Sequence, residues 1–374
     1  MINIKNISLI LTVLTFFSGC IEPDAEDLWS VSVDNILVTE GFARDVDIYD
    51  NFAIVASGQS GIQIWDLSSL VRLSNFTGYY EGGSFLEFDD INLVGVDTLN
   101  KLIFSSESNK DVKIFHYDGQ DTILYRNTIM SAKTRDFISF SNMKDEFYMF
   151  SADNDDGIKW HRYDLDSTSA FGIDFVEWTP FGGNEIYTPG KPEGIDSDGG
   201  SLIALAVDQM GVELYSIDSL GANPILLGRV GTEGNAEKVA LVSEGIFASC
   251  DDAGAYYIPI DNFLDTNTIY KKLTIRSKDN KLGYTIELRD IEEKNEVIRF
   301  ASDFTVDHIA INNGNNIAAL SLGSKGIALY DITDPKNPIE RGLFSIGYTY
   351  SSVFWDDNIV VCSREGLQII SIYQ

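Results

Sequence analysis

A unit of about 45 residues recurs along this chain, and it constrains the fold more than any other feature. In each clear copy an apolar strand precedes a turn that ends in glycine, and a second, alternating strand follows, as in residues 51–66 and 316–331. The turn glycines are Gly61, Gly157, Gly211, Gly254, Gly326 and Gly366. A seventh copy, around Lys110, lacks the glycine. Repeats of this length and β-type pattern predict an all-β fold, a single β-propeller of four-stranded blades.

The seven copies predict seven blades, but eight stay open because 72 residues separate Gly254 from Gly326. The excess, about residues 271–299, shows no strand pair around a turn glycine, which favours an inserted hairpin. The last copy ends at Gln374, after its third strand. Residues 29–38 have the pattern of a strand, so we expect them to supply the outer strand of the last blade and close the ring.

These copies resemble the LVIVD repeat, a propeller-forming unit of bacterial and archaeal surface proteins. The match is carried by Ala53–Ala56 with Gly61–Asp66, and by Gly326–Asp331 with Asp334–Pro338 behind it. It covers the chain from about residue 40 onward. The resemblance implies that residues 29–374 form one propeller, and it brings no catalytic motif with it.

The N-terminal residues 1–19 have the pattern of an export signal, in which Lys5 precedes an apolar stretch too short to span a bilayer. The sequence Ser18-Gly19-Cys20 resembles a bacterial lipobox, in which Cys20 would carry the lipid. An ordinary signal peptide with a chance cysteine is the alternative, although an isolated cysteine is uncommon in exported proteins. The acidic tether, residues 20–28, resembles the surface-export signal of Bacteroidota lipoproteins. We expect a lipid anchor in the bacterial outer membrane, at the cell surface or the periplasmic face.

The charge balance excludes several classes of partner. The 57 acidic residues against 27 basic ones give a formal net charge of −30, which leaves no basic surface for nucleic acid or for anionic lipid. The membrane contact expected is therefore the lipid anchor alone. A chain with 44% hydrophobic residues is not disordered despite its charge. We expect a monomer, because strong like charge opposes self-association, and an envelope protein or a glycan as the partner.

A candidate ligand site lies where the first strand of each blade begins, at one mouth of the channel. Six of the seven aligned copies place a charge there, and apolar residues follow two positions later. The candidate residues are Arg44, Asp89, Arg135, Glu193, Glu237 and Asp307, with His308 beside the last. Mixed charges that converge on a funnel favour a polar ligand, such as a sugar, a peptide or a cation. The alternative is that these charges pair with one another around a water-filled channel.

A calcium site is a further, weaker hypothesis, and no other cofactor is expected. Asp153, Asp155 and Asp156 precede Gly157, and clustered carboxylates at a tight turn suit a hard cation. The segment lacks the 12-residue loop and closing glutamate of an EF-hand. An acidic blade turn without a metal is the alternative.

Catalytic signatures are missing from the sequence. It contains no nucleophile elbow, phosphate-binding loop or dinucleotide fingerprint, and its three histidines have no metal-ligand spacing. The sequence favours a non-catalytic binding or scaffold module for a protein partner or glycan. The alternative is a surface polysaccharide hydrolase or lyase that uses carboxylates such as Glu193 and Glu237 at the mouth.

Overall fold

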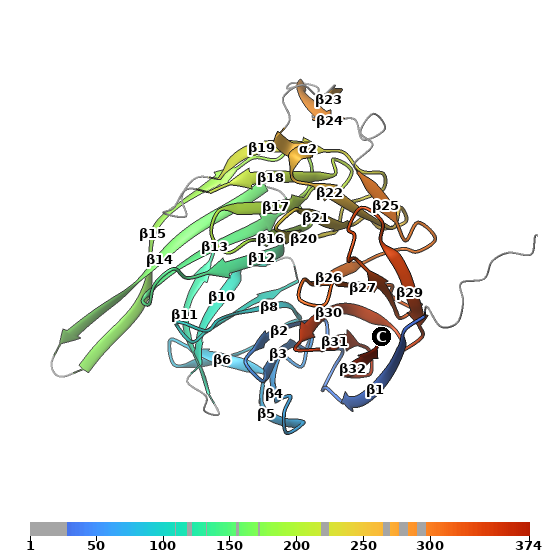
Figure 1. Ribbon diagram of the computed structural model, residues 1–374. Helices are drawn as coiled ribbons and strands as arrows, with labels where there is room; N and C mark the ends of the chain where they lie inside the picture. Colours follow the sequence, from blue (N-terminus) through green and yellow to red (C-terminus); the bar gives the residue numbers. More distant parts are fainter. Residues whose placement is uncertain are drawn as a thin grey trace, which may run out of the picture.

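The chain folds into a ring of seven blades, each of four antiparallel strands, so it is a seven-bladed β-propeller (Figure 1). The computed structural model describes residues 28–374 apart from 109, 118–121, 132, 155–156, 171–172, 218–223, 265–269, 277–282 and 290–296. The first strand of each blade contacts the first strand of the next, and the last blade contacts the first. The predicted architecture is therefore confirmed, with seven blades rather than eight.

Each blade runs from its first strand at the axis to its fourth strand at the rim. Blade 1 comprises β2 (Asp45–Tyr49), β3 (Phe52–Ala56), β4 (Ile62–Asp66) and β5 (Val71–Phe76). Blade 2 comprises β8 (Ile91–Asp97), β9 (Leu102–Glu107), β10 (Val112–Tyr117) and β11 (Ile123–Ile129). Blade 3 comprises β12 (Thr134–Phe140), β13 (Glu146–Asp153), β14 (Gly157–Ala170) and β15 (Ile173–Ile186). Blade 4 comprises β16 (Gly194–Ser197), β17 (Leu202–Ala206), β18 (Val212–Ser216) and β19 (Ile225–Val230). Blade 5 comprises β20 (Lys238–Val242), β21 (Gly245–Ser249), β22 (Ala255–Pro259) and β25 (Ile298–Phe300). Blade 6 comprises β26 (His308–Asn312), β27 (Ile317–Ser321), β28 (Ile327–Asp331) and β29 (Ile339–Phe344). Blade 7 comprises β30 (Thr349–Trp355), β31 (Asn358–Ser363), β32 (Gly366–Tyr373) and β1 (Ser30–Leu37).

The middle strands are apolar along their whole length because neighbouring blades cover both of their faces. The second strands of blades 1 and 6, FAIVA and IAALS, are buried or nearly so at every position. A strand covered on both faces requires such a continuous apolar run. The buried apolar side chains of the described residues form seven clusters, one between each pair of adjacent blades. The core is therefore a ring of interfaces around the channel.

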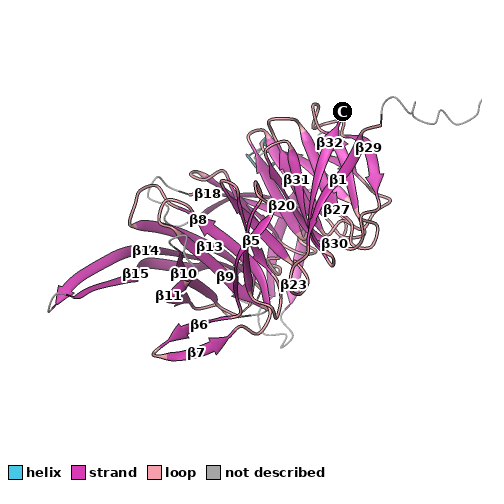
Figure 2. Cartoon of the chain, turned by 90° about the horizontal axis from the view of Figure 1, so that it is seen from below, coloured by secondary structure: helices cyan, strands magenta, loops and turns pink. Residues whose placement is uncertain are grey.

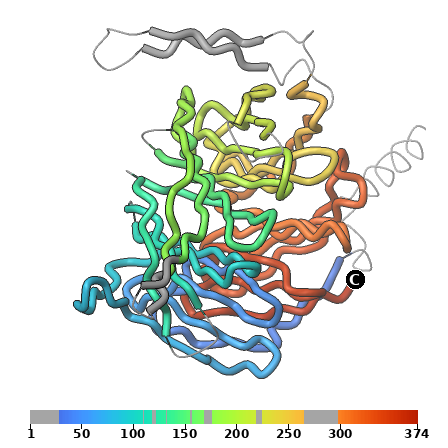
Figure 3. The backbone as a smooth tube through the Cα atoms, turned by 90° about the vertical axis from the view of Figure 1, so that its left-hand side faces the viewer, coloured from blue at the N-terminus to red at the C-terminus, as the bar shows by residue number. Residues whose placement is uncertain are grey.

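The two ends of the described chain close the ring, as the sequence predicts. β1 pairs antiparallel with β32 from Ser30↔Tyr373 to Leu37↔Leu367. Figure 3 shows the blue N-terminal strand beside the red C-terminal one. Just before β1, the backbone amide of Trp29 donates to the carbonyl of Arg341 in blade 6, at 2.8 Å. Blade 7 therefore joins residues from both ends of the sequence and leaves no open edge in the ring.

Segments outside the blades are short. β23 (Tyr270–Arg276) and β24 (Gly283–Arg289) pair as an antiparallel hairpin in the segment expected to be an insertion. A one-turn helix, α2 (Asp261–Leu264), precedes it. β6 (Gly78–Glu81) and β7 (Ser84–Glu87) form another hairpin, which projects from the ring on the same side as the long β14–β15 arm (Figure 2). No helix in the described part of the chain is long and apolar enough to cross a bilayer.

The expected export signal, Cys20 and nearly all of the acidic tether fall within residues 1–27, outside the described residues. The other two cysteines, Cys250 and Cys362, are buried free thiols in blades 5 and 7. Burial raises the pKa of the Cys250 thiol to about 12, so it behaves as a small apolar side chain rather than as a nucleophile.

Candidate functional site

A polar cavity of about 310 Å³ lies on the axis of the propeller, between the first strands. Six of the seven blades contribute to its lining, and blade 2 does not. Its charged and polar lining residues are Asp45, Asp136, Asp196, Lys238, His308, Asn313 and Ser352. A polar cavity at the convergence of several elements is a natural ligand site unless its groups are already bound to one another.

Most of the residues predicted to form the site do not face this cavity. Of the predicted site residues, the cavity lining includes His308 alone. The other six do not line it and lie at or just before the openings of the first strands: Arg44, Asp89, Arg135, Glu193, Glu237 and Asp307.

Three of these six charges are engaged with neighbouring side chains. Arg135 forms an ion pair with Glu193 at 3.4 Å, which joins blades 3 and 4. The carboxylate of Asp89 lies 3.0 Å from Lys110 within blade 2. Both pairs are partly exposed, and exposed pairs contribute little to stability. They lower the net charge that the mouth presents to a ligand.

Two further acids at the openings are crowded by like charges. Burial, and after it the charges of Glu193, Asp251 and Asp208, raise the pKa of Glu237 to about 7. Burial and the charge of Asp251 also raise the pKa of Asp307. Arg44 lies across the ring from them, with its guanidinium 5.0 Å from the ring centre of Tyr350. The openings of blades 4 to 6 therefore form an acidic sector rather than an even mixture of charges.

Lys238 is the cation of the channel. Its Nζ lies 2.8 Å from Oδ2 of Asp136, a contact that reaches from blade 5 to blade 3. Burial acts to lower the pKa of Lys238, but the charge and hydrogen bond of Asp136 and the charge of Asp45 outweigh it and raise that pKa. The ammonium group therefore stays charged, and its charge is satisfied inside the protein.

Carboxylates of the first strands also connect successive blades. In each case a side-chain oxygen accepts a hydrogen bond from a backbone amide of the next first strand. The pairs are Asp45 with the amide of Val94 (3.1 Å), Asp47 with Val96 (2.8 Å), Asp136 with Ile195 (3.1 Å) and Asp196 with Leu241 (2.7 Å). Sequence reasoning missed Asp47 and Asp196, although each lies two residues after a strand opening, at Asp45 and Gly194, on the same side of its strand.

Three of these carboxylates, Asp45, Asp47 and Asp196, are costly to ionise. Burial raises the pKa of Asp45 to about 7 and the pKa of both Asp47 and Asp196 to about 6, against the hydrogen bonds that lower them. Burial, followed by the charge of Lys238, lowers the pKa of His308 to about 3, so its imidazole is neutral near pH 7. His308 consequently cannot serve as an acid at neutral pH. The channel groups are arranged to hold blades together.

The calcium hypothesis rests mainly on residues that the structure does not describe. Asp155 and Asp156 lie outside the described residues. Asp153 is fully buried, accepts a hydrogen bond from the hydroxyl of Ser131, and lies 3.5 Å from the Nζ of Lys159. Where side chains are described, no group of three or more His, Cys, Asp or Glu residues is placed to hold a metal ion.

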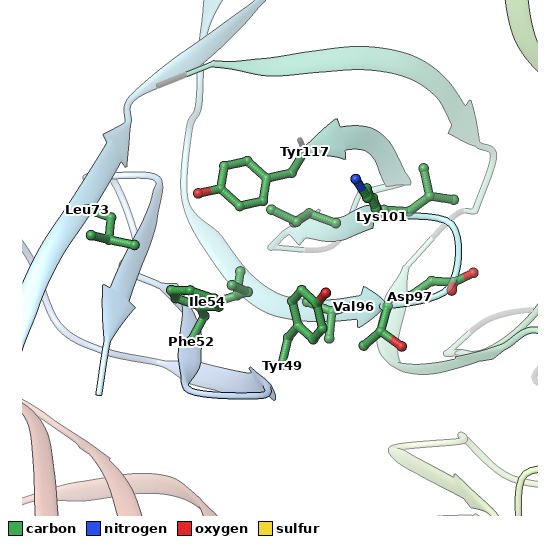
Figure 4. A pocket seen from close by; sticks show the side chains of 11 residues that line it. Tyr49, Phe52, Ile54, Leu73, Val96, Asp97, Lys101 and Tyr117 are labelled. Atoms are coloured by element: carbon green, nitrogen blue, oxygen red, sulfur yellow. The ribbon is translucent and has the colours of Figure 1, made fainter. Parts of the chain in front are cut away.

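An apolar pocket of about 220 Å³ opens between blades 1 and 2, at the opposite end of the first strands from their openings (Figure 4). Its walls are mainly aromatic and aliphatic: Tyr49, Phe52, Ile54, Leu73, Val96 and Tyr117. Figure 4 shows Lys101 and Asp97 at one side of it and Leu73 at the other. We call it the blade 1–2 pocket. Sequence reasoning missed it because its residues come from two blades.

Leu73 on the outer strand of blade 1 is 43% exposed at this pocket. An exposed aliphatic side chain at a small apolar pocket is typical of surfaces that bind other proteins. Tyr80 and Phe85 of the β6–β7 hairpin are also exposed, at 70% and 47%, but they do not line this pocket.

Comparisons with known proteins support the fold alone. No protein-family model matches the sequence, and no curated protein is significantly similar to it. Among solved structures, the chain is similar to U3-55K (TM-score 0.63, 10% identity, 91% of this chain and 97% of that one). It is also similar to the WD40 repeats of RRP9 (TM-score 0.60, 10% identity, 91% and 96%) and to the computationally designed protein Ika8 (TM-score 0.53, 12% identity, 90% and 98%). At such identities the similarity extends to the propeller architecture and no further.

Proposed function

We propose that this chain is a non-catalytic binding module that holds a protein partner at the blade 1–2 pocket. The observation that carries the proposal is the contrast between the two cavities. The charged groups of the channel bind one another and the backbone of adjacent blades, whereas the blade 1–2 pocket has apolar walls and leaves Leu73 43% exposed. Propellers similar in fold supply rigid faces for partner docking, which fits this use.

The test is site-specific cross-linking in cells. A photoreactive amino acid replaces Leu73, which lines the pocket, or Ile339, which lies on the outer strand of blade 6 and is also 43% exposed. A discrete cross-linked protein from position 73, and none or much less from position 339, supports the proposal. Equal cross-linking from both positions, or none from position 73, refutes it.

The envelope location belongs to the same proposal. The LVIVD-like repeats and the lipobox-like Ser18-Gly19-Cys20 support a lipid-anchored member of that family in the bacterial outer membrane. Cys20→Ala should abolish metabolic labelling by a palmitate analogue and release the protein from the membrane fraction. Protease treatment of intact cells then distinguishes the cell surface from the periplasmic face. A variant that remains labelled and membrane-bound would contradict the anchor.

A second candidate function is cleavage of a surface polysaccharide, as a hydrolase or as a lyase. It is favoured by one observation, the pKa of about 7 at Glu237 beside the charge of Glu193, since a carboxyl group that can give up a proton near neutral pH and a neighbouring carboxylate are the machinery of glycosidases. The engagement of Glu193 with Arg135 weighs against it. Turnover on a polysaccharide panel that disappears in the Glu193→Gln/Glu237→Gln variant would support this function, and no turnover by the unmodified protein would reject it.

A further inference from the structure

A second surface cavity, of about 380 Å³, lies between blades 2 and 3 on the same face as the blade 1–2 pocket. The two cavities meet at Lys101, in the turn between β8 and β9, which lines both. Lys101, Arg126 and Lys144 contribute cations to the second cavity, which we call the basic pocket. Leu165, Val176 and Trp178 form part of its apolar wall.

The charge of the basic pocket is opposite to that of the molecule. Acidic residues outnumber basic ones by 57 to 27 in the chain. This cavity, by contrast, is lined by two lysines, one arginine and a single carboxylate, that of Asp145. Cations elsewhere are mostly paired, as Lys113 is with Glu107 and Arg341 with Asp331. Within the described structure, none of the ion pairs includes Lys101, Arg126 or Lys144.

Arg126 shows most clearly that a negative group fits here. Its side chain is partly buried on the outer strand of blade 2, and its hydrogen-bond contact is a long one of 3.5 Å to the carbonyl of Val176. Burial lowers its pKa, and among the described residues no carboxylate acts against that effect. A guanidinium that is partly removed from water gains most from a carboxylate partner, which it can bind through two hydrogen bonds.

Lys101 occupies a position that does not suit lysine conformationally. Its φ is +55°, and its carbonyl accepts a hydrogen bond from Tyr117, the last residue of the third strand. Blades 3 and 6 place Asp145 (φ +66°) and Asn316 (φ +54°) directly before the second strand in the same way. Asparagine and aspartate tolerate the left-handed region better than lysine does. Its place in the turn therefore does not explain the lysine, whereas its charge at the junction of the two cavities does.

The turns that carry these cations are held together. The side chain of Asn100 donates to the carbonyl of Glu146 at 2.9 Å and accepts from the amide of Asp145 at 2.7 Å. These bonds fix the β8–β9 turn of blade 2 against the turn before β13 of blade 3. Lys101 and Lys144 are therefore presented from a rigid base, which reduces the entropy lost when a ligand binds.

We propose that the partner binds through an extended acidic segment that crosses both cavities. A large apolar side chain enters the blade 1–2 pocket, and acidic side chains follow it into the basic pocket. This inference rests on the proposed function and specifies the chemistry of the partner. The basic pocket offers no open aromatic face for a sugar, because Trp178 is 3% exposed and packs against Phe147 at 5.1 Å between ring centres. A peptide supplies both an apolar group and closely spaced carboxylates.

A peptide-display selection tests the inference. The full-length protein, purified in detergent, selects binders from a random library of 12-residue peptides, and the enriched peptides are then synthesised and their affinities measured. The variants are Lys101→Asn, Arg126→Gln, Lys144→Gln and all three combined, with Lys336→Asn as the control at an exposed lysine of blade 6. Lys101→Asn removes the charge and at the same time suits the turn, so lost binding cannot be ascribed to lost folding.

The expected peptides combine a large aromatic or aliphatic residue with two or more acidic residues. Each single variant should lower their affinity by roughly two- to five-fold, and the triple variant by more than about ten-fold. Lys336→Asn should leave the affinity unchanged. Binding should also weaken as salt concentration rises.

Three results would overturn the inference: enriched peptides without acidic residues, affinity unchanged in the triple variant, or no enrichment at all. Tighter binding of an oligogalacturonate than of any acidic peptide would also overturn it. The proposed function is judged separately by cross-linking at position 73, because a partner without an acidic segment would still cross-link there.

Discussion

At the scale of single residues, aspartates of the first strands connect the blades. Asp45, Asp47, Asp136 and Asp196 each accept a backbone amide hydrogen bond from the next blade in the ring. Hydrogen bonds to a charged acceptor are stronger than neutral ones, but burial of the carboxylate opposes ionisation. For Asp45, Asp47 and Asp196 burial prevails, and their pKa values rise to about 7, 6 and 6.

This balance predicts how stability depends on pH. A carboxyl group whose pKa rises from 3.8 unfolded to about 7 folded keeps its proton in the native state between those values. The native state then binds more protons than the unfolded state, so the free energy of unfolding falls as pH rises from about 4 to 7. Asn at position 45 still accepts the amide hydrogen bond of Val94 but carries no charge.

The free energy of unfolding of Asp45→Asn should therefore rise relative to that of the unmodified protein by about 3 kcal/mol between pH 5 and pH 8, because the native carboxyl group loses its proton only near pH 7. Urea unfolding at both pH values measures this difference. Asp303→Asn, at an exposed carboxylate of blade 6, is the control and should change neither value appreciably. A variant whose stability relative to the unmodified protein did not rise between pH 5 and pH 8 would contradict the account of Asp45.

The role of these residues was only partly predictable. The alignment of repeats identified where the first strands begin, and Asp45, Asp136 and Lys238 lie at or near these openings. We predicted the ligand site at the residue just before each of these, at Arg44, Arg135 and Glu237. Which of two adjacent positions faces the axis depends on the tilt of each blade, and that tilt is set by packing between blades rather than by the pattern along one strand.

At the scale of elements, the turn glycines explain why the repeat was visible. Gly326 has φ +91°, and a Cβ there would lie 2.1 Å from the carbonyl oxygen of Phe344 in the outer strand. Gly61 is similar, with φ +81° and a distance of 2.0 Å to the carbonyl oxygen of Phe76. Only glycine fits both the conformation and the close approach of the fourth strand. Blade geometry therefore fixes these glycines in the sequence.

The projecting elements were not predicted. The β14–β15 arm and the β6–β7 hairpin extend beyond the blades that carry them (Figure 2). Apolar and polar residues alternate in these segments as they do in the blade strands. How far a strand extends beyond its blade depends on how much of it the neighbouring blade can cover. Repeat spacing alone does not contain that information.

The closing strand β1 should be essential to the fold. Deletion of residues 29–38 removes the fourth strand of blade 7 and exposes the edge of β32, as well as Ile359 and Ile370 of the cluster between blades 6 and 7. The expected result is loss of a single cooperative thermal transition, or a large fall in its midpoint. Circular dichroism during heating provides the measurement.

A matched deletion serves as the control for β1. Residues 166–177 of the β14–β15 arm can be replaced by an Asn-Gly turn, because Leu165 and Trp178 are paired across the arm. This deletion removes a similar length of chain beyond the blade and should leave the unfolding midpoint nearly unchanged. If the two deletions were equally harmful, closure by β1 would not be the source of stability.

At the scale of the whole molecule, the proposed docking face exists only in the assembled ring. Tyr49 and Tyr117 meet across the blade 1–2 pocket although they belong to different repeats, and Lys101 joins that pocket to the basic pocket. A sequence pattern reports which residues of one strand share a face, but it does not report which blade edges oppose each other. The strands and the fold could therefore be predicted from the sequence. The two pockets could not, because each lies between residues of different blades.

Docking of a protein partner on this face can be tested by comparing how much of that partner two surface variants retain. Leu73→Glu places a charge in the apolar pocket, and Ile339→Glu places one on an equally exposed position of blade 6. Quantitative mass spectrometry of material cross-linked in cells and purified with each variant gives the ratio. The account predicts that Leu73→Glu retains less than about one tenth of the partner held by Ile339→Glu, since burying an unpaired charge costs more than a typical contact gains. Equal retention by the two variants would contradict it.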